Sequence, residues 1–128
     1  MIGAKEVSMS LNVSTVKDGR GGIFTFLPKE PIVEINLVVI KAGHFRGEHY
    51  HKEFVEYFLI VSGLGLYVTK DEKGNRVQKV VSGGEMFRVE KGTPHVVYAI
   101  ENMRCISALS KKWDDCDEPI TYTGEEDI

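Results

Sequence analysis

Short apolar segments separated by turn residues run through most of the chain and limit the folds that it can adopt. The segments are rich in Val, Ile, Phe or Tyr, and they cover residues 7–13, 23–27, 35–40, 54–61, 65–69, 77–81, 86–89, 95–100 and 103–109. Turn signals such as Asp18-Gly19 and Lys73-Gly74-Asn75 separate them, and no stretch keeps a helical period over three turns. The sequence therefore predicts one all-β domain of short antiparallel strands, arranged as a sandwich or barrel.

Length and charge restrict the possible partners. At 128 residues the chain fits one domain with its own hydrophobic core. Its net charge is -3, and its Lys and Arg residues are scattered among acids, so we expect neither a nucleic-acid nor a membrane partner. The N-terminal residues lack a signal-peptide pattern, and no run reaches transmembrane length, which favours a cytoplasmic protein. Cys105 and Cys116 are expected to be reduced thiols.

The segment VEYFLIV, residues 55–61, is apolar on both faces of its predicted strand. A strand of this kind needs cover on its outer face as well as its inner one. We expect that cover to come from another sheet or from a second subunit, and a homodimer is therefore predicted.

The composition changes after residue 110. Residues 111–128 read KKWDDCDEPITYTGEEDI, which is acidic and contains a Pro and a Gly. We interpret this stretch as a solvated or partly ordered tail that follows a β-barrel domain of residues 1–110. Trp113 and Tyr122 are the side chains that would dock the tail locally.

Two histidines in the stretch RGEHYHKEFVE are spaced for chelation. His49 and His51 lie two residues apart, so on a strand they point to the same face. After a turn, the next strand can bring Glu56 back beside them. A carboxylate among apolar neighbours on an inward face is costly to bury unless it is paired or bound to a metal.

A third histidine follows the Gly92-Thr93-Pro94 turn. His95 lies at the start of its strand, where it can converge with His49, His51 and Glu56. Three imidazoles and a carboxylate suit a divalent metal, with Zn²⁺ favoured and Fe²⁺, Mn²⁺ or Ni²⁺ as alternatives. His44, in a loop beside a glycine, has no matching partner and is interpreted as structural or exposed.

These residues carry a resemblance to the cupin family. Gly43, His49, His51, Glu56 and Gly63 match the spacing of the first cupin motif without a gap. Gly84, Gly92 and His95 match the second motif, whereas Glu90 and Ala99 stand where proline and asparagine are usual. The resemblance implies a single-domain jelly-roll β-barrel of short antiparallel strands, with the metal site inside and often a dimer.

A narrower resemblance concerns sugar metabolism. The stretches KDGRGGIFTF and RGEHYH are similar to those of cupin epimerases and ketoisomerases that act on nucleotide-linked 4-keto-6-deoxy sugars, and especially to the C-terminal cupin of the capsular polysaccharide epimerase/reductase. An epimerase or isomerase of polysaccharide biosynthesis is therefore expected. Because a diphosphate needs fixed cations, the candidates for substrate binding are Arg20, Lys41 and Arg46.

The catalytic group is less well defined by the sequence. Tyr67 and Tyr98 are candidates for returning a proton, although strand alternation turns Tyr98, like Tyr57, toward the outer face. The rhamnose-pathway epimerases use a metal-free histidine with an acid and a tyrosine, whereas this chain offers a metal set. An iron-dependent dioxygenase and a carbohydrate-binding module without activity are the alternatives, because the same ligands serve all three.

Overall fold

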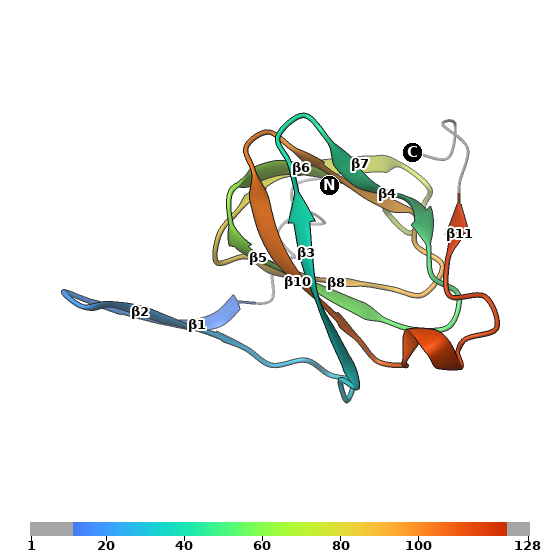
Figure 1. The fold of residues 1–128 in the computed structure, drawn as a ribbon, viewed down its shortest axis with the longest axis horizontal. Coiled ribbons are helices and arrows are strands. Elements are labelled where there is room, and N and C mark those ends of the chain that lie inside the picture. The colour runs from blue at the N-terminus through green and yellow to red at the C-terminus, as the bar shows by residue number, and fades with distance from the viewer. Residues whose placement is uncertain (1–11, 123–128) are drawn as a thin grey trace.

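The computed structural model describes residues 12–122, which form a β-barrel of two facing sheets with a projecting hairpin (Figure 1). The strands are β1 (Asn12–Asp18), β2 (Gly21–Phe26), β3 (Glu34–Ile40), β4 (Phe45–Tyr50), β5 (Glu56–Ser62), β6 (Leu64–Lys70), β7 (Arg76–Ser82), β8 (Met86–Val89), β9 (His95–Ala99), β10 (Met103–Leu109) and β11 (Thr121–Tyr122), and a 3₁₀ helix, η1 (Trp113–Asp115), precedes β11. One sheet has the order β3-β10-β5-β8 and the other β11-β4-β9-β6-β7. The pairs are antiparallel, which confirms the predicted all-β class.

Most strands lie where the apolar segments predict them. β8 and β10 have the predicted bounds, and β2, β3, β5, β6, β7 and β9 differ from theirs by at most two residues. The predicted strand at residues 7–13 lies almost wholly outside the described residues, whereas β1 continues to the turn at Asp18. β4 carries His49 but ends at Tyr50, so His51, which the alternation argument places on the same strand, lies just beyond it.

The core lies between the two sheets. Inward side chains of both sheets form one buried cluster, which consists of Ile40, Phe58, Ile60, Tyr67, Val81, Phe87, Val89, Val97, Ala99, Met103 and Cys105. The two cysteines are free thiols, as expected, and burial raises the pKa of Cys105 to about 11.

Residues 111–122 belong to the stretch that we interpret as a solvated or partly ordered tail, and most of them are exposed. Here η1 and β11 fold back against the barrel, and β11 pairs with β4 (Figure 1). Trp113 packs against Phe54, with ring centroids 6.2 Å apart, and Tyr122 meets the ring of His49. The two aromatic residues thus dock this stretch, as expected, but they dock it against the predicted metal site.

The outer face of β5 is covered by the segment that joins β2 to β3. Tyr57 points to this face, opposite to Glu56, and it is fully buried. Its cluster consists of Val55, Tyr57, Met86 and Ala108, with Phe26, Ile32 and Leu59 packed against it. At Tyr57, this apolar strand is therefore covered by another segment of the same chain and not by a second subunit.

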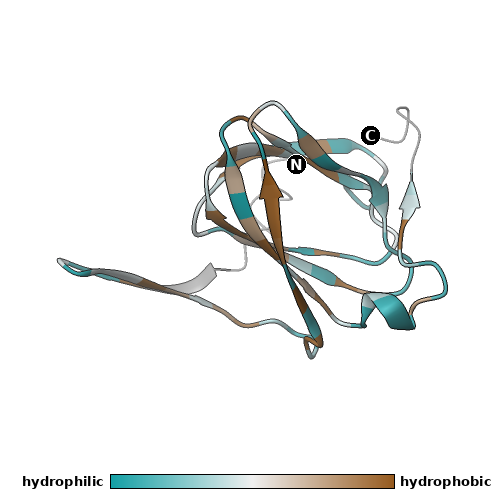
Figure 2. Ribbon diagram, viewed as in Figure 1, coloured by the Kyte–Doolittle hydropathy of each residue, from teal (hydrophilic) through white to brown (hydrophobic). Residues whose placement is uncertain are grey.

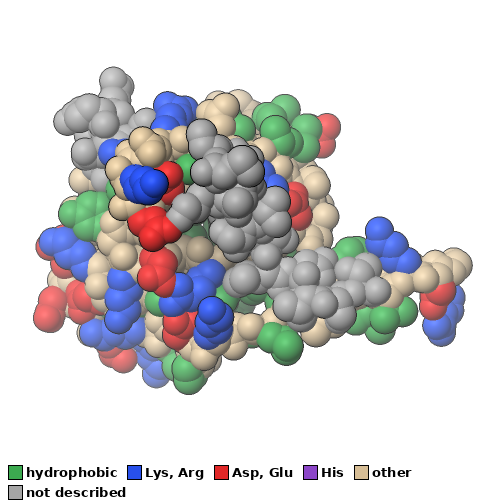
Figure 3. Space-filling view, turned by 180° about the vertical axis from the view of Figure 1, so that it is seen from behind, with side chains coloured by type: hydrophobic (Ala, Val, Ile, Leu, Met, Phe, Trp, Pro, Cys, Tyr) green, Lys and Arg blue, Asp and Glu red, His purple; other side chains and the backbone are tan. Residues whose placement is uncertain are grey.

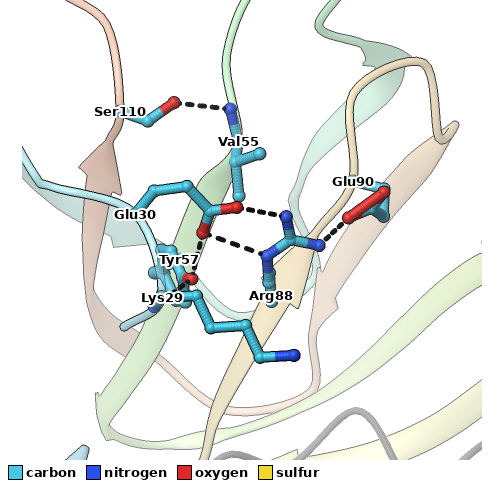
Figure 4. Close-up of polar contacts among 7 residues, drawn as sticks. All are labelled: Lys29, Glu30, Val55, Tyr57, Arg88, Glu90 and Ser110. Carbon is cyan, nitrogen blue, oxygen red and sulfur yellow. Dashed lines mark hydrogen bonds and ion pairs between the residues drawn. The ribbon is translucent and has the colours of Figure 1, made fainter. Parts of the chain in front are cut away.

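A polar cluster fastens the joining segment to the barrel (Figure 4). The Tyr57 hydroxyl donates to the Glu30 carboxylate and accepts a hydrogen bond from the Lys29 amide at 2.8 Å. The Arg88 guanidinium donates two hydrogen bonds to Glu30 and also pairs with Glu90. Hydrogen bonds from Arg88 and Tyr57 lower the pKa of Glu30 to about 2, so the carboxylate is ionised at neutral pH.

The surface carries both signs of charge. On the face seen in Figure 3, acidic and basic side chains are interspersed over the barrel without a large patch of one sign. None of the described residues forms a helix with the length and hydrophobicity that crossing a bilayer requires.

Glu30→Gln should destabilise the protein at neutral pH but not in acid. Because folding lowers the pKa of Glu30 from its usual 4.5 to about 2, its stabilising effect is complete above pH 4.5 and is lost as the pH falls toward 2. Urea unfolding should show a lower midpoint for the variant at pH 7, and the difference should shrink across that window. Glu101→Gln, at an exposed acid in the β9–β10 turn, is the control. A difference that does not depend on pH would contradict the assignment.

Candidate metal centre and its cavity

The close approach of β4 to β9 sets two of the histidines opposite each other. His49 pairs with His95 in the register, after a shift between Gly47 and His49. A Cβ atom at Gly47 would lie 2.5 Å from the His95 carbonyl oxygen, and Gly47 has φ 125°, so this position requires glycine. Glu48 is the bulged residue, with φ 60°, and such bulges re-aim side chains beside functional sites.

His51 completes a group of three imidazoles. The ring centroids of His49 and His51 are 4.7 Å apart, and those of His51 and His95 are 5.2 Å apart. Each histidine offers a ring nitrogen, and the three nitrogens lie within 4.8 Å of one another. The predicted convergence of these three residues is therefore observed.

Glu56 approaches the histidines from the opposite sheet. Its Oε1 lies 3.4 Å from Nε2 of His51 and 3.4 Å from Nε2 of His95, and its Oε2 accepts a hydrogen bond from the Ser107 hydroxyl. Burial raises the pKa of Glu56, but the hydrogen bonds of the two imidazoles outweigh it and hold the pKa below its usual value. The carboxylate is thus ionised although it is buried.

Backbone carbonyls orient two of the rings. Nδ1 of His51 lies 2.9 Å from the Pro119 carbonyl oxygen, and Nδ1 of His95 lies 3.0 Å from that of Thr93. A carbonyl only accepts, so each Nδ1 carries a proton and each Nε2 is turned toward Glu56. Metal-binding histidines commonly have such an outer partner.

His49 is less buried than the other two rings, and its surroundings hold it neutral. Burial, followed by the neighbouring charges of His95 and His51, lowers the pKa of His49 to about 3. A neutral imidazole keeps a lone pair for a cation. The three imidazole nitrogens fit a divalent metal ion, as in metal sites that keep an open position, and the Glu56 carboxylate lies beside two of them.

The histidines line a cavity of about 190 Å³ inside the barrel. Its inner wall is apolar and is formed by Val38, Phe58, Tyr67, Phe87, Val89 and Val97, while Asn36, Arg46, Ser107 and Trp113 complete the lining. The histidines and Arg46 therefore form a polar part of the lining. A molecule bound to the metal centre would also contact the apolar wall.

The structure separates the predicted substrate-binding residues. Arg46 lines the cavity, whereas Lys41 lies in an adjoining surface groove, which shares Arg46 with the cavity and is also lined by His44. Arg20 is on the projecting hairpin, exposed and paired with Asp18 at 2.7 Å, and it does not line the cavity. His44 is exposed, as expected.

The candidate tyrosines also differ in position. Tyr67 is buried, lines the cavity and packs on Phe87 with ring centroids 4.1 Å apart. Burial raises its pKa. Tyr98 points to the other face of its sheet, where its ring lies 5.5 Å from that of Phe45. Of these two candidates, only Tyr67 is brought to the site.

Three further residues of the site are not predicted as site residues from the sequence. Ser107 follows from alternation on β10, because it shares a face with Cys105 of the core. Pro119 and Trp113 belong to the stretch read as a tail, and no periodicity marks them. Their only signal was the presence of an aromatic residue and a proline in an otherwise acidic segment.

Solved structures with a similar fold include enzymes of sugar-nucleotide metabolism. The capsular polysaccharide assembling protein CapF from Staphylococcus aureus matches 86% of this chain at 22% identity with a TM-score of 0.64, and the chain spans 34% of CapF. A 3,4-ketoisomerase from Helicobacter canadensis matches 91% of both chains at 17% identity, with a TM-score of 0.76.

A third similar structure is the epimerase RmlC from Legionella pneumophila in complex with dTDP-4-keto-L-rhamnose. It matches 85% of this chain and 68% of its own at 17% identity, with a TM-score of 0.71. At such identities the likeness shows the fold, and it confirms the predicted cupin jelly roll. No curated protein matches the chain.

The family model of the polysaccharide biosynthesis C-terminal domain matches residues 16–114, from the hairpin through β10 to η1. This range includes the four predicted metal ligands and most of the cavity wall. The chain belongs to the polysaccharide biosynthesis C-terminal domain family.

Proposed function

We propose that this protein is a cytoplasmic, metal-dependent epimerase or isomerase that acts on a nucleotide-linked 4-keto-6-deoxy sugar in polysaccharide biosynthesis. The observation that carries the proposal is the convergence of three imidazoles at one side of a cavity in the barrel, with a buried carboxylate beside two of them. The family description and the fold shared with sugar-nucleotide epimerases and ketoisomerases support the substrate class.

The metal would be held by His49, His51, His95 and Glu56, with Zn²⁺ favoured and Fe²⁺, Mn²⁺ or Ni²⁺ as alternatives. A divalent ion at this point supplies Lewis-acid stabilisation to the negative charge that develops on a ketone oxygen. Ser107 holds the carboxylate of Glu56 in place, and the Thr93 and Pro119 carbonyls hold the rings. The donor set is therefore organised before the ligand arrives.

The cavity fits one sugar ring. Its volume of about 190 Å³ is smaller than the roughly 300–1,000 Å³ of sites that enclose drug-sized ligands, so the nucleotide must lie outside it. The apolar wall around Phe58 and Phe87 suits a carbon without a hydroxyl group, as in a 6-deoxy sugar. A hydroxyl buried against that wall would lose its hydrogen bonds to water.

A cation at the cavity mouth would receive the diphosphate. Arg46 lines both the cavity and the adjoining groove, which makes it the first candidate for this cation. Lys41 lies in the same groove and adds a second positive charge. Arg20 has the least support of the three, because it pairs with Asp18 on the projecting hairpin.

The reaction would begin when a base takes the proton from the carbon beside the ketone, and an epimerisation would end when an acid delivers a proton to the opposite face of that carbon. We assign the delivery to Tyr67, which lines the apolar part of the cavity and stays protonated because burial raises its pKa.

The purified protein should exchange solvent deuterium into the sugar. In D₂O, NMR spectra of UDP-, dTDP- and GDP-linked 4-keto-6-deoxy sugars should show incorporation beside the ketone for at least one of them. Chelation of the metal or His49→Ala should abolish the exchange, and re-addition of the metal should restore it to the wild type only. No exchange with any of the sugars, or oxygen consumption in its place, would contradict the proposal.

Tyr67→Phe and Tyr98→Phe form a matched pair, since each removes one hydroxyl. Tyr67→Phe should lower the rate of epimerisation by about 100-fold or more, as loss of a general acid does. Its metal content should not change, because Tyr67 is not a proposed ligand. Tyr98→Phe should keep the wild-type rate. Equal rates for the two variants would remove Tyr67 from the mechanism.

We also propose that the protein is a homodimer. The outward side chains of β3, Ile35, Leu37 and Val39, are 68%, 66% and 46% exposed, and this edge strand is strongly apolar (Figure 2). An uncovered apolar edge strand is a site for association, and a second copy would cover it.

Leu37→Lys should shift the protein toward a monomer, because it places a charge in the centre of the apolar face of β3. Sedimentation velocity over a range of concentrations would measure the shift. Val80→Lys is the control, at a 57% exposed position on β7 in the other sheet. A wild-type protein that sediments as a monomer at high concentration would contradict the dimer.

A further inference from the structure

The stretch from Lys111 to Tyr122, here named the C-terminal segment, encloses one side of the metal centre. β11 pairs with β4 at Tyr50 and His49, so the segment lies directly beside a proposed ligand. The Pro119 carbonyl oxygen lies 2.9 Å from Nδ1 of His51. The segment is thus in contact with two of the three histidines.

A network of charged groups holds the C-terminal segment against the loop that follows His51. Glu53 is its centre: Oε2 accepts the Glu118 amide at 2.7 Å, and Oε1 accepts Lys111 Nζ at 3.0 Å. Lys52 pairs with the Glu118 carboxylate at 3.0 Å. Glu53 therefore contacts the C-terminal segment at two points, Lys111 and Glu118. It does not line the cavity, and it is not one of the proposed metal ligands.

Two contacts of Trp113 hold the first residues of the C-terminal segment in place. The Trp113 ring lies 6.1 Å from that of His51 and lines the cavity. The Trp113 amide donates to Glu34 on β3 at 2.9 Å. The segment therefore joins β3 to β4 across the metal centre.

We propose that the C-terminal segment is a component of the metal centre, in which Glu53 is a positioning residue that keeps the Pro119 carbonyl on His51. This inference rests on the proposed function, in which His51 is a metal ligand. The hydrogen bond from Nδ1–H fixes the ring so that Nε2 faces the donor set. Without the carbonyl, the ring can rotate or carry its proton on Nε2, and either change removes a donor from the ion.

The expected effect is large enough to measure. Loss of an outer partner of a metal-binding histidine typically weakens metal binding by about 10-fold to 100-fold. Glu53→Ala removes the acceptor for both the Glu118 amide and Lys111, and should produce an effect of this size. Glu53→Gln keeps an acceptor for the amide and should retain most of the wild-type affinity.

Glu85→Ala is a matched control in a different part of the barrel. Like Glu53, Glu85 accepts one backbone amide, that of Ser82 at 2.7 Å, and pairs with one lysine, Lys79 at 3.0 Å. It is half-buried in the turn between β7 and β8, away from the histidines. A loss of affinity that follows from destabilisation alone would appear in both alanine variants.

Co²⁺ titration measures the affinity, with a competing chelator and the visible absorption of the bound ion as readouts. Glu53→Ala should bind Co²⁺ about 10-fold to 100-fold more weakly than the wild type and show an altered spectrum, while Glu53→Gln and Glu85→Ala should remain close to it. Trp113 is the only tryptophan in the chain, so its fluorescence reports the position of the segment. Equal affinities in Glu53→Ala and the wild type would overturn the proposal.

A second measurement works without metal and separates this inference from the proposed function. Nitrogen-15 NMR of the metal-free wild type should show a proton on Nδ1 of His51, and Glu53→Ala should lose this protonation while Glu85→Ala keeps it. If the wild type failed to bind Co²⁺, the metal proposal would fall, and the NMR comparison would still decide the role of the segment. An unprotonated Nδ1 in the wild type would overturn it.

Discussion

The buried carboxylate of Glu56 is the constraint on which the rest of the site depends. An ionised group inside a barrel is costly unless other groups compensate for it. Here the compensation comes from His51 and His95 on one side and from Ser107 on the other. Because Glu56 belongs to one sheet and His95 to the other, the same contacts that solvate the charge also join the two sheets at the cavity.

Backbone geometry makes this arrangement possible. Gly47 lets β4 approach β9 so closely that His49 stands opposite His95, and the bulge at Glu48 aims the following side chains. His51 lies just beyond the end of β4, where the Gly92 amide donates to its carbonyl oxygen at 2.8 Å. The ligand positions are therefore set by main-chain contacts as much as by the side chains themselves.

The sequence predicted the parts of the molecule that follow local rules. Alternation along a strand put His49 and His51 on one face, and β8 and β10 were bounded by turn residues that act over two or three positions. The contacts that escaped prediction join distant stretches. The Pro119 carbonyl meets His51 across 68 residues, and Glu30 reaches Arg88 across 58. Such contacts depend on the tertiary structure. An acidic segment has no periodic sequence pattern from which they could be predicted.

X-ray absorption spectroscopy of the Zn²⁺-loaded protein tests the central claim most directly, because it reports the atoms bound to the ion. The account predicts one Zn²⁺ per chain, with scattering from three imidazoles at about 2.0–2.1 Å and from a carboxylate oxygen. His51→Ala should remove one imidazole from that spectrum. A spectrum with sulfur at about 2.3 Å, or with a single imidazole, would show that the histidines do not share an ion.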